Sequence, residues 1–170
     1  MAIRPAPWPH LVRRFIATLL ARVDPITLSA LDNVLSPAER RLFLTMVEAD
    51  QQHSLDLCDR LCRDGHDNPD LLRAALLHDV GKASGRLPIM YRVAYTMSAM
   101  VSPRLTRWLG RPNPDGWRRP FYLAAHHPEI GAAAALRAGS SARVVGLIAG
   151  HSKPGSDELS RALYTYDRRS

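Results

Sequence analysis

The sequence predicts an all-α protein, and three features indicate this fold class. Ala and Leu are abundant, whereas aromatic residues make up only 6% of the 170 residues. Runs that alternate β-branched or aromatic residues with polar ones between turn signals are almost absent. Several segments instead begin with a capping residue followed by proline, a common helix start. A chain of this length suits one domain, and we expect a single helical bundle with an N-terminal helical extension.

The first 48 residues are expected to form an arm and helices that pack on the core. Three prolines make residues 1 to 10 an extended arm, and residues 11 to 22 have the apolar spacing of a docking helix. Residues 36 to 39, Ser-Pro-Ala-Glu, combine an N-cap, a proline at the first helical position and a capping-box glutamate. A helix is therefore expected to start there.

The next helices are expected to carry three polar residues that matter below. Apolar positions recur at helical spacing from residue 37 to 62, which places His53 within a long helix or just beyond a break in it. Asn68 is expected to cap a helix over residues 69 to 80. That helix carries His78 and Asp79 at its C-terminal end.

Proline and glycine divide the remaining sequence. Residues 87 to 109 are apolar but interrupted by arginines, which argues against a membrane span, and residues 110 to 120 read as a loop. Pro128 predicts a break between two helices, with His127 as a non-helical N-cap. Two more helices are expected, over residues 142 to 151 and 157 to 167.

Charge is distributed unevenly along the chain. Residues 1 to 79 carry nine Lys and Arg against eleven Asp and Glu, whereas residues 80 to 170 carry fourteen against five. A positively charged surface on the second half of the chain would attract phosphorylated substrates, nucleic acid or an anionic membrane, or would serve solubility alone. Residues 86 to 119 are consistent with an interfacial helix, a lid or a core helix.

These features set expectations about partners and location. We expect a small phosphorylated substrate, with a nucleotide as one candidate, and we do not expect nucleic acid. Peripheral membrane contact stays open, and the oligomeric state is not indicated. The apolar stretch near the N-terminus is broken by Arg13 and Arg14 and lacks a small-residue cleavage site, so a cytoplasmic location is predicted.

Six residues that commonly bind metals occur in the order H…HD…H…H…D. They are His53, His78, Asp79, His127, His151 and Asp167. An aspartate near a helix C-terminus is disfavoured by the helix dipole, and a bound cation would reverse that effect. Four neutral imidazoles and two carboxylates carry a charge of −2, so two divalent ions bound to them keep a net positive charge. That charge can bind a hydroxide and a phosphate oxygen. Nitrogen and oxygen ligands without thiolate favour Fe, Mn or Co over Zn or Mg.

These residues at these intervals resemble the HD-domain metal-dependent phosphohydrolase superfamily. The match runs from about residue 49 to 167 and implies an all-α HD domain over residues 49 to 170. The resemblance implies two metal ions that share Asp79 as a bridging ligand. It divides the other ligands into His53, His78 and Asp167 for one ion, and His127 and His151 for the other.

The additional histidines are typical of binuclear branches such as the HD-GYP cyclic-dinucleotide phosphodiesterases and the symmetrical dinucleoside-polyphosphate hydrolases. Ser152-Lys153-Pro154 stands where the HD-GYP branch has Gly-Tyr-Pro, so cyclic di-GMP cleavage is not expected. We predict hydrolysis of a phosphate ester or anhydride by a metal-activated hydroxide at Asp79. Lys82, which is similar to the family's phosphate-contacting lysine, and Arg86 are expected to bind phosphate, and His126 to donate a proton.

Two other functions stay open on the same residues. A small branch of the superfamily uses a di-iron site to oxygenate its substrates, and it has the same ligand order. The chain is also consistent with a non-catalytic module that binds a nucleotide or a membrane surface and uses metal only structurally.

Overall fold

All secondary structure that the structure describes is helical, as the sequence predicts. The computed structural model describes residues 31–85, 91, 94, 95, 97, 98, 101–111 and 116–169, and no β-strand occurs among them. With η marking a 3-10 helix, the elements are η1 (Leu31–Asn33), α3 (Pro37–Phe43), α4 (Glu48–Arg63), α5 (Pro69–Leu77), η2 (Val80–Gly85), α7 (Pro103–Leu109), α8 (Arg119–Arg137), α9 (Ala142–Gly150) and α10 (Glu158–Arg169).

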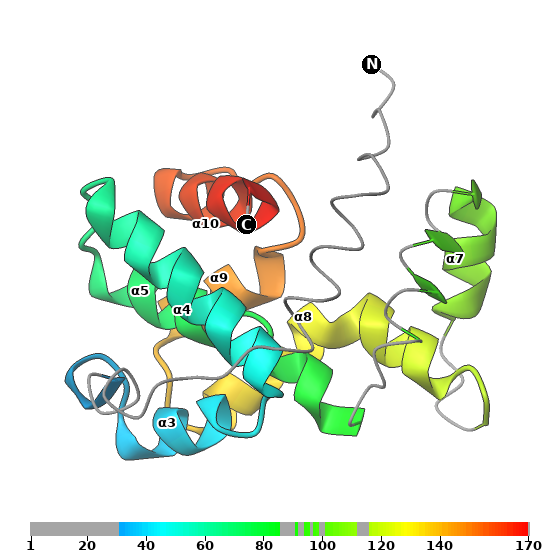
Figure 1. Ribbon diagram of the computed structural model, residues 1–170, viewed down its shortest axis with the longest axis horizontal. Helices are drawn as coiled ribbons and strands as arrows, with labels where there is room; N and C mark the ends of the chain where they lie inside the picture. The colour runs from blue at the N-terminus through cyan, green and yellow to red at the C-terminus, as the bar shows by residue number, and fades with distance from the viewer. Residues whose placement is uncertain are drawn as a thin grey trace.

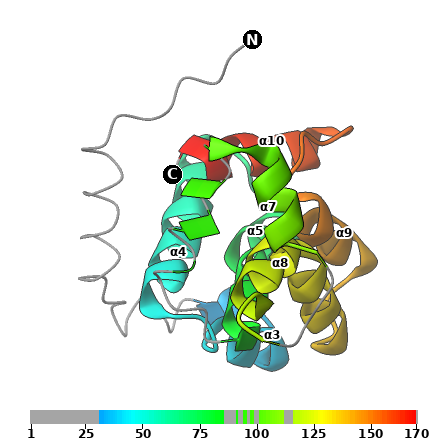
Figure 2. The same ribbon diagram turned by 90° about the vertical axis from the view of Figure 1, so that its right-hand side faces the viewer.

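The helices enclose a common core of aliphatic side chains. α8 packs against η2 and α9, and α5 packs against α4 and α9. α10 and α3 lie at opposite ends of this bundle (Figures 1 and 2). The largest fully buried side chains are Phe43, Leu57, Leu61, Leu71, Leu76, Leu77, His78, Val80, Val144, Leu147, Ile148 and Leu163. One polar residue, His78, is therefore embedded in an otherwise apolar set.

The cap at the start of α3 is confirmed. The Ser36 N–H donates to Glu39 Oε2 at 2.9 Å, and the Glu39 N–H donates to Ser36 Oγ at 3.3 Å. Glu39 also accepts a hydrogen bond from Ser140 Oγ at 2.7 Å. Since Ser140 lies between α8 and α9, this buried carboxylate ties the start of α3 to a distant turn. Asn68 and Ser141 cap α5 and α9.

The helical run expected over residues 37 to 62 consists of two helices. α3 ends at Phe43 and α4 begins at Glu48, with Val47 extended at the N-cap position. Gln51 Nε2 donates to the Met46 carbonyl oxygen at 2.8 Å and so stabilises the turn. His53 therefore lies inside α4, in its second turn.

The prediction of a break at Pro128 is wrong. α8 runs through Pro128 without interruption, so His127 is a helical residue and not an N-cap. Pro128 has no N–H for the carbonyl of Ala124, which normally weakens a helix at this point. The His127 ring donates to that carbonyl instead, from Nδ1 at 2.8 Å. Packing of α8 against η2 and α9 also holds the helix together across the proline.

Two glycines allow η2 to cross α8 at very short range. A Cβ added at Gly81 would lie 2.0 Å from the carbonyl oxygen of His127 and 2.8 Å from the nitrogen of Gly131. A Cβ at Gly131 would lie 3.1 Å from the nitrogen of Gly81. Asp79 precedes this crossing by two residues. The close approach therefore brings the Asp79 carboxylate toward His127.

Some expectations fall on residues that the structure does not describe. The extended arm and docking helix of residues 1 to 22 lie outside the described residues, as does Arg86. η1 and α3, from the rest of the first 48 residues, contribute to the same core as the later helices. In the described part of the chain, no helix has the length and apolar composition needed to cross a bilayer.

Candidate metal centre

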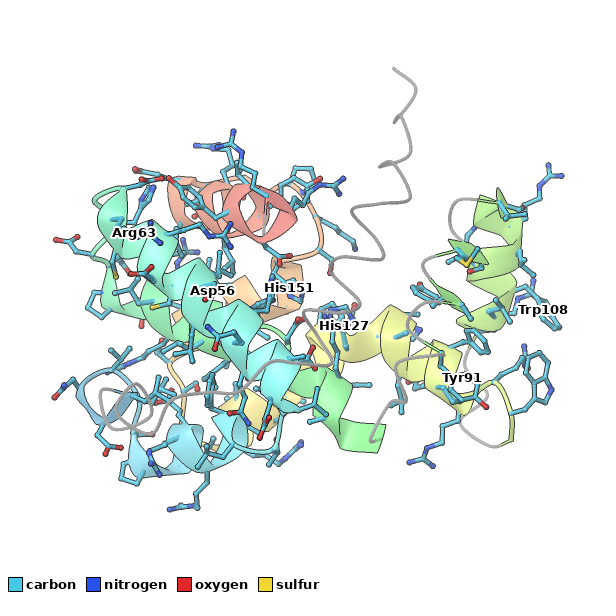
Figure 3. All side chains as sticks on the ribbon, viewed as in Figure 1. Asp56, Arg63, Tyr91, Trp108, His127 and His151 are labelled. Atoms are coloured by element: carbon cyan, nitrogen blue, oxygen red, sulfur yellow. The ribbon has the colours of Figure 1, made fainter. Side chains whose placement is uncertain are left out.

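The six expected ligands converge in two adjacent groups. Within each group, one nitrogen or oxygen atom per residue lies within 4.8 Å of the others. The groups are His53, His78 and Asp167, and Asp79, His127 and His151. The ring centroids of His78 and His151 are 5.0 Å apart, so the groups are neighbours. Figure 3 shows the side chains of His127 and His151 next to each other near the middle of the molecule.

The first group joins α4, the end of α5 and α10. His53 Nε2 lies 3.0 Å from Asp167 Oδ1, and Nε2 of His78, the C-cap of α5, lies 3.4 Å from the same oxygen. The His78 side chain is 1% exposed, whereas those of His53 and Asp167 are 22% and 24% exposed. The group is therefore closed toward the core and reachable from solvent on its His53 and Asp167 side.

The second group joins the end of α5, the middle of α8 and the end of α9. Nε2 of His127 lies 3.2 Å from Nε2 of His151, the C-cap of α9, and 3.6 Å from Asp79 Oδ1. His151 and Asp79 are buried. His127 keeps 15% of its side chain exposed, so solvent reaches this group as well.

Asp79 contacts both groups. Its Oδ2 lies 3.5 Å from His78 Nε2 in the first group, and its Oδ1 lies 3.6 Å from His127 Nε2 in the second. Oδ2 also accepts a hydrogen bond from Lys82 Nζ at 2.5 Å. A carboxylate that directs one oxygen toward each group is suited to be a shared ligand.

The main chain sets the same tautomer in three of the histidines. Nδ1 of His78, His127 and His151 lies 2.8, 2.8 and 2.7 Å from the carbonyl oxygen three residues earlier. A carbonyl oxygen only accepts hydrogen bonds, so Nδ1 carries a proton in each ring. In a neutral ring, Nε2 then has the free lone pair, and metal-binding histidines commonly show this arrangement.

Two features of the centre are unfavourable without a cation. The Nε2 atoms of His127 and His151 direct lone pairs at each other across 3.2 Å. His78 Nε2 is buried and has no hydrogen-bond partner among the residues that the structure describes. Two nitrogens bound to one metal ion at about 2.1 Å lie about 3.0 to 3.4 Å apart. The donor atoms present therefore fit a metal ion.

Burial keeps the histidines of the second group neutral. Burial lowers the pKa of His127 to about 3, and the positive charge of Lys82 acts in the same direction. The pKa of His151 is also below its ordinary value, first because of burial and then because of the charge on His78. At neutral pH both rings have the unprotonated Nε2 that a metal requires.

Both carboxylates are held in the ionised form. Burial acts to raise the pKa of Asp79, but the positive charges of His78 and Lys82 outweigh it and hold the pKa well below its ordinary value. The pKa of Asp167 is likewise lowered against burial, by the hydrogen bond with His53 and by the nearby positive charge of His78. In return these carboxylates raise the pKa of His78 despite its burial. The negative charge in the centre therefore favours a bound cation.

Lys82 lies at the solvent side of the centre, in η2. Its Nζ contacts Asp79 Oδ2 while 26% of its side chain stays exposed. An ammonium group in this position can meet a phosphate that arrives from solvent. Arg86, the other expected phosphate ligand, is outside the described residues, and its role stays a prediction.

His126 is not brought into the centre. Its Nε2 donates to the carbonyl oxygen of Gly110 at 3.1 Å, and its ring lies 4.5 Å from that of Tyr122 between centroids. It lines a cavity of about 360 Å³ with residues of α7 such as Arg107. Consecutive helical residues point about 100° apart. With His127 directed at the centre, His126 is directed elsewhere, and the geometry gives no support to a role as proton donor.

The groups that orient the histidines were not predicted from the sequence. They are the main-chain carbonyls of Ala75, Ala124 and Ile148. Two signals were present in the sequence. Carbonyls in the last turn of a helix lack helical partners, as at the ends of α5 and α9. A proline one residue after a histidine frees the carbonyl three residues before that histidine.

The fold and the site define an all-α protein with a candidate metal centre of four histidines and two aspartates. Comparisons of the chain with models of protein families, with curated proteins and with solved structures find no match. A function for this protein has to follow from the chemistry of the centre.

Proposed function

We propose that this protein is a metal-dependent phosphohydrolase that cleaves a phosphate ester or anhydride of a nucleotide or another small phosphorylated metabolite. The observation that carries the proposal is the convergence of six nitrogen and oxygen donors in two adjacent groups, with Asp79 directed at both. Divalent cations there would supply an activated water and offset the charge of the reacting phosphate. The resemblance of the ligand order to HD-domain phosphohydrolases supports the same function.

In this proposal each group of ligands holds one metal ion. His53, His78 and Asp167 would hold one ion, His127 and His151 would hold the other, and Asp79, which faces both groups, would be available to each. Because the donors are imidazoles and carboxylates without a thiolate, Fe, Mn or Co suits the centre better than Zn or Mg.

Lys82 binds a non-reacting phosphate oxygen in this proposal. Its ammonium group lies at the rim of the centre, beside Asp79, and is partly exposed. A fixed positive charge at such a position offsets the charge of the phosphate and orients it. The excess of Lys and Arg over Asp and Glu after residue 80 attracts phosphorylated molecules to the same half of the chain.

The experiment that tests the proposal combines metal analysis with phosphate release. Protein purified without chelator is assayed for bound metal and for hydrolysis of a panel of nucleotides and generic phosphodiesters. The panel is run for wild type, Asp79→Asn and a matched control, Asp56→Asn, which alters an exposed carboxylate on α4. We expect about two metal ions per chain, with metal and turnover lost in Asp79→Asn and retained in Asp56→Asn.

Two outcomes would contradict the proposal. Two bound irons with oxygen uptake and no phosphate release would identify an oxygenase with the same ligands. Protein without metal, even after incubation with Fe, Mn or Co, would leave only a non-catalytic binding module.

A further inference from the structure

A second region of the molecule stands apart from the metal centre. We call it the 91–121 arm, defined as residues 91, 94, 95, 97, 98, 101–111 and 116–121. In Figure 1 its helix, α7, lies beyond α8 as seen from α4, α5 and α10. In Figure 3 Trp108 lies at the outer edge of this region, away from His127 and His151. The proposed phosphohydrolase activity makes no use of this surface.

The arm holds most of the exposed apolar side chains that the structure describes. Nine large hydrophobic residues are exposed in the described part of the chain, and six of them belong to the arm. They are Val101 at 76%, Trp117 at 63%, Met97 at 44%, Trp108 at 42%, Leu105 at 39% and Tyr91 at 36%. Single exposed apolar residues are ordinary, whereas a group of this kind marks an interaction surface.

These side chains are neighbours in space. The ring centroids of Trp108 and Trp117 are 5.9 Å apart, those of Trp117 and Phe121 are 6.2 Å apart, and those of Phe121 and Tyr91 are 5.6 Å apart. Leu105 and Trp108 are three residues apart on α7 and share one face of that helix. Tyr91, Trp117 and Trp108 are thus connected in one aromatic row through Phe121, which is itself buried, and Leu105 lies beside Trp108.

α7 does not need this surface for its own packing. Thr106, on another side of α7, is already packed, because its Oγ1 lies 3.1 Å from Ser98 Oγ. Leu109, one turn after Leu105, is 7% exposed and so is covered as well. At its end, a Cβ added at Gly110 would lie 2.8 Å from the Cβ of Ala125, so α7 closes tightly on α8. The apolar face of Leu105 and Trp108 points outward.

The same surface is positively charged. The arm contains Arg104, Arg107, Arg111, Arg118 and Arg119, and its described residues include no Asp or Glu. Over residues 86 to 128 the sequence has seven arginines and one acidic residue, Asp115. The Arg118 guanidinium lies 5.1 Å from the centroid of the Trp108 ring and donates to the Trp108 carbonyl oxygen at 3.1 Å. Cationic and aromatic groups are thus interleaved.

We propose that the 91–121 arm is a contact surface for an anionic lipid bilayer. The indole rings and aliphatic side chains enter the boundary between headgroups and acyl chains, and the arginines bind lipid phosphates. Tryptophan prefers this boundary, and basic residues beside an apolar face strengthen binding to anionic lipid. Single-stranded nucleic acid is bound by stacking on aromatic rings. Val101, Met97 and Leu105 offer no such stacking surface, which favours the bilayer.

The first test measures co-sedimentation of the full chain with vesicles of phosphatidylglycerol and phosphatidylcholine, or of phosphatidylcholine alone. We expect binding to the anionic vesicles only. Arg104→Gln with Arg119→Gln should weaken that binding by about tenfold to thirtyfold. The matched control, Arg41→Gln with Arg137→Gln, removes the same charge from exposed positions outside the arm and should bind nearly as wild type does.

The second test locates the contact. The chain has three tryptophans, so Trp8→Phe leaves Trp108 and Trp117 as the only ones. Lipids brominated in their acyl chains should quench the fluorescence of this variant when it binds. Trp108→Ser with Trp117→Ser should reduce vesicle binding about tenfold or more. Leu136→Ser, at a position 61% exposed on α8, should leave it unchanged.

Several results would overturn the proposal. They are equal binding to neutral and anionic vesicles, retention of binding by both arm variants, or absence of quenching. Binding of a single-stranded oligonucleotide without binding of vesicles would assign the arm to nucleic acid. A dimer that Trp108→Ser with Trp117→Ser dissociates, in the absence of vesicle binding, would assign it to self-association. Because vesicle binding is measured without substrate, failure here leaves the phosphohydrolase proposal untouched.

Discussion

Nδ1 of His127 donates a hydrogen bond to the carbonyl oxygen of Ala124 at 2.8 Å, and this is the carbonyl that Pro128 leaves without a helical partner. The proline therefore does not end the helix. It leaves the Ala124 carbonyl oxygen free to accept, and this acceptor orients the His127 ring so that Nε2 faces His151 in the candidate metal centre. A residue that usually breaks helices here positions a candidate metal ligand.

Replacing Pro128 should lower the affinity for metal with little change in the stability of the fold. In Pro128→Ala the restored N–H competes with His127 for the Ala124 carbonyl, so the ring loses part of its orientation. We expect affinity for Co²⁺ or Mn²⁺ to fall about tenfold, the low end for groups that orient a ligand. The free energy of unfolding should stay within about 1 kcal/mol, since the regained hydrogen bond offsets lost apolar contact. Metal titration and thermal unfolding measure the two effects.

Pro120→Ala is the matched control, because Pro120 lies in the first turn of the same helix, where a missing N–H has little effect. Metal affinity should not change in this variant. Equal affinities for wild type and Pro128→Ala would show that the Ala124 carbonyl does not orient His127.

Metal binding should stabilise the folded chain. The ligands come from five different helical segments, so an ion that binds only the folded state links them. At a free metal concentration about one hundred times Kd, the gain is about 2.7 kcal/mol. Differential scanning fluorimetry with Mn²⁺ or Co²⁺, before and after EDTA, should show a reversible rise in Tm. His127→Ala, which removes a ligand of one of the two groups, should lose part of this rise, whereas His66→Ala, outside the centre, should keep all of it.

Removing the Lys82 ammonium should reduce turnover without removing metal. In Lys82→Met the contact with Asp79 is lost, but all six ligands remain. If Lys82 holds the phosphate, kcat/KM for phosphate release should fall about 100-fold to 1000-fold, as for loss of one preorganised donor. Metal content should stay near that of wild type. Loss of metal together with turnover would mean that Lys82 supports the ligands and not the substrate.

A methyl group at Gly81 should disrupt the crossing of η2 and α8. The new Cβ would lie 2.0 Å from the His127 carbonyl oxygen, so one backbone must move. We expect Gly81→Ala to lower the free energy of unfolding by about 3 kcal/mol or more. Urea denaturation measures this change. Gly146→Ala in α9, where the added Cβ has nothing within 4 Å, should instead raise stability by about 0.5 to 1 kcal/mol.

Glu39 should contribute stability that depends on pH. Burial acts to raise its pKa, but hydrogen bonds from Ser140 and Ser36 outweigh it, so the pKa lies below its usual 4.5. A carboxyl group whose pKa is lowered by folding stabilises the protein above its unfolded pKa. That contribution is lost as pH falls from 4.5 through the folded pKa. The free energy of unfolding of wild type should therefore be about 1 to 3 kcal/mol higher than that of Glu39→Gln at pH 7.

The difference in free energy of unfolding between wild type and Glu39→Gln, measured by urea denaturation, should become smaller below pH 4.5. Glu48→Gln, at the exposed start of α4, is the control that shows the effect of removing an exposed carboxylate. A difference that stays constant down to pH 3 would show that the ionised form of Glu39 contributes nothing specific.

Local signals in the sequence predicted local structure well. The capping box at Ser36 and Glu39 and the cap at Asn68 are confirmed, since a cap depends on residues two or three apart. The error at Pro128 has the opposite cause. Helix propensity assigns proline a free-energy cost inside a helix. It does not take into account that the His127 ring donates to the Ala124 carbonyl, which Pro128 leaves free, or that α8 packs against η2 and α9.

The sequence by itself determined the helical fold class, most helix starts and the six histidine and aspartate residues that can form a metal site. Their periodicity and capping are local properties of the chain. Only the tertiary structure decided that the six side chains meet in two groups around Asp79, and that His126 turns away toward Gly110. The ligands of each group come from helices distant in the sequence, and their distances depend on close packing such as that between Gly81 and the backbone of His127. No local pattern encodes such packing.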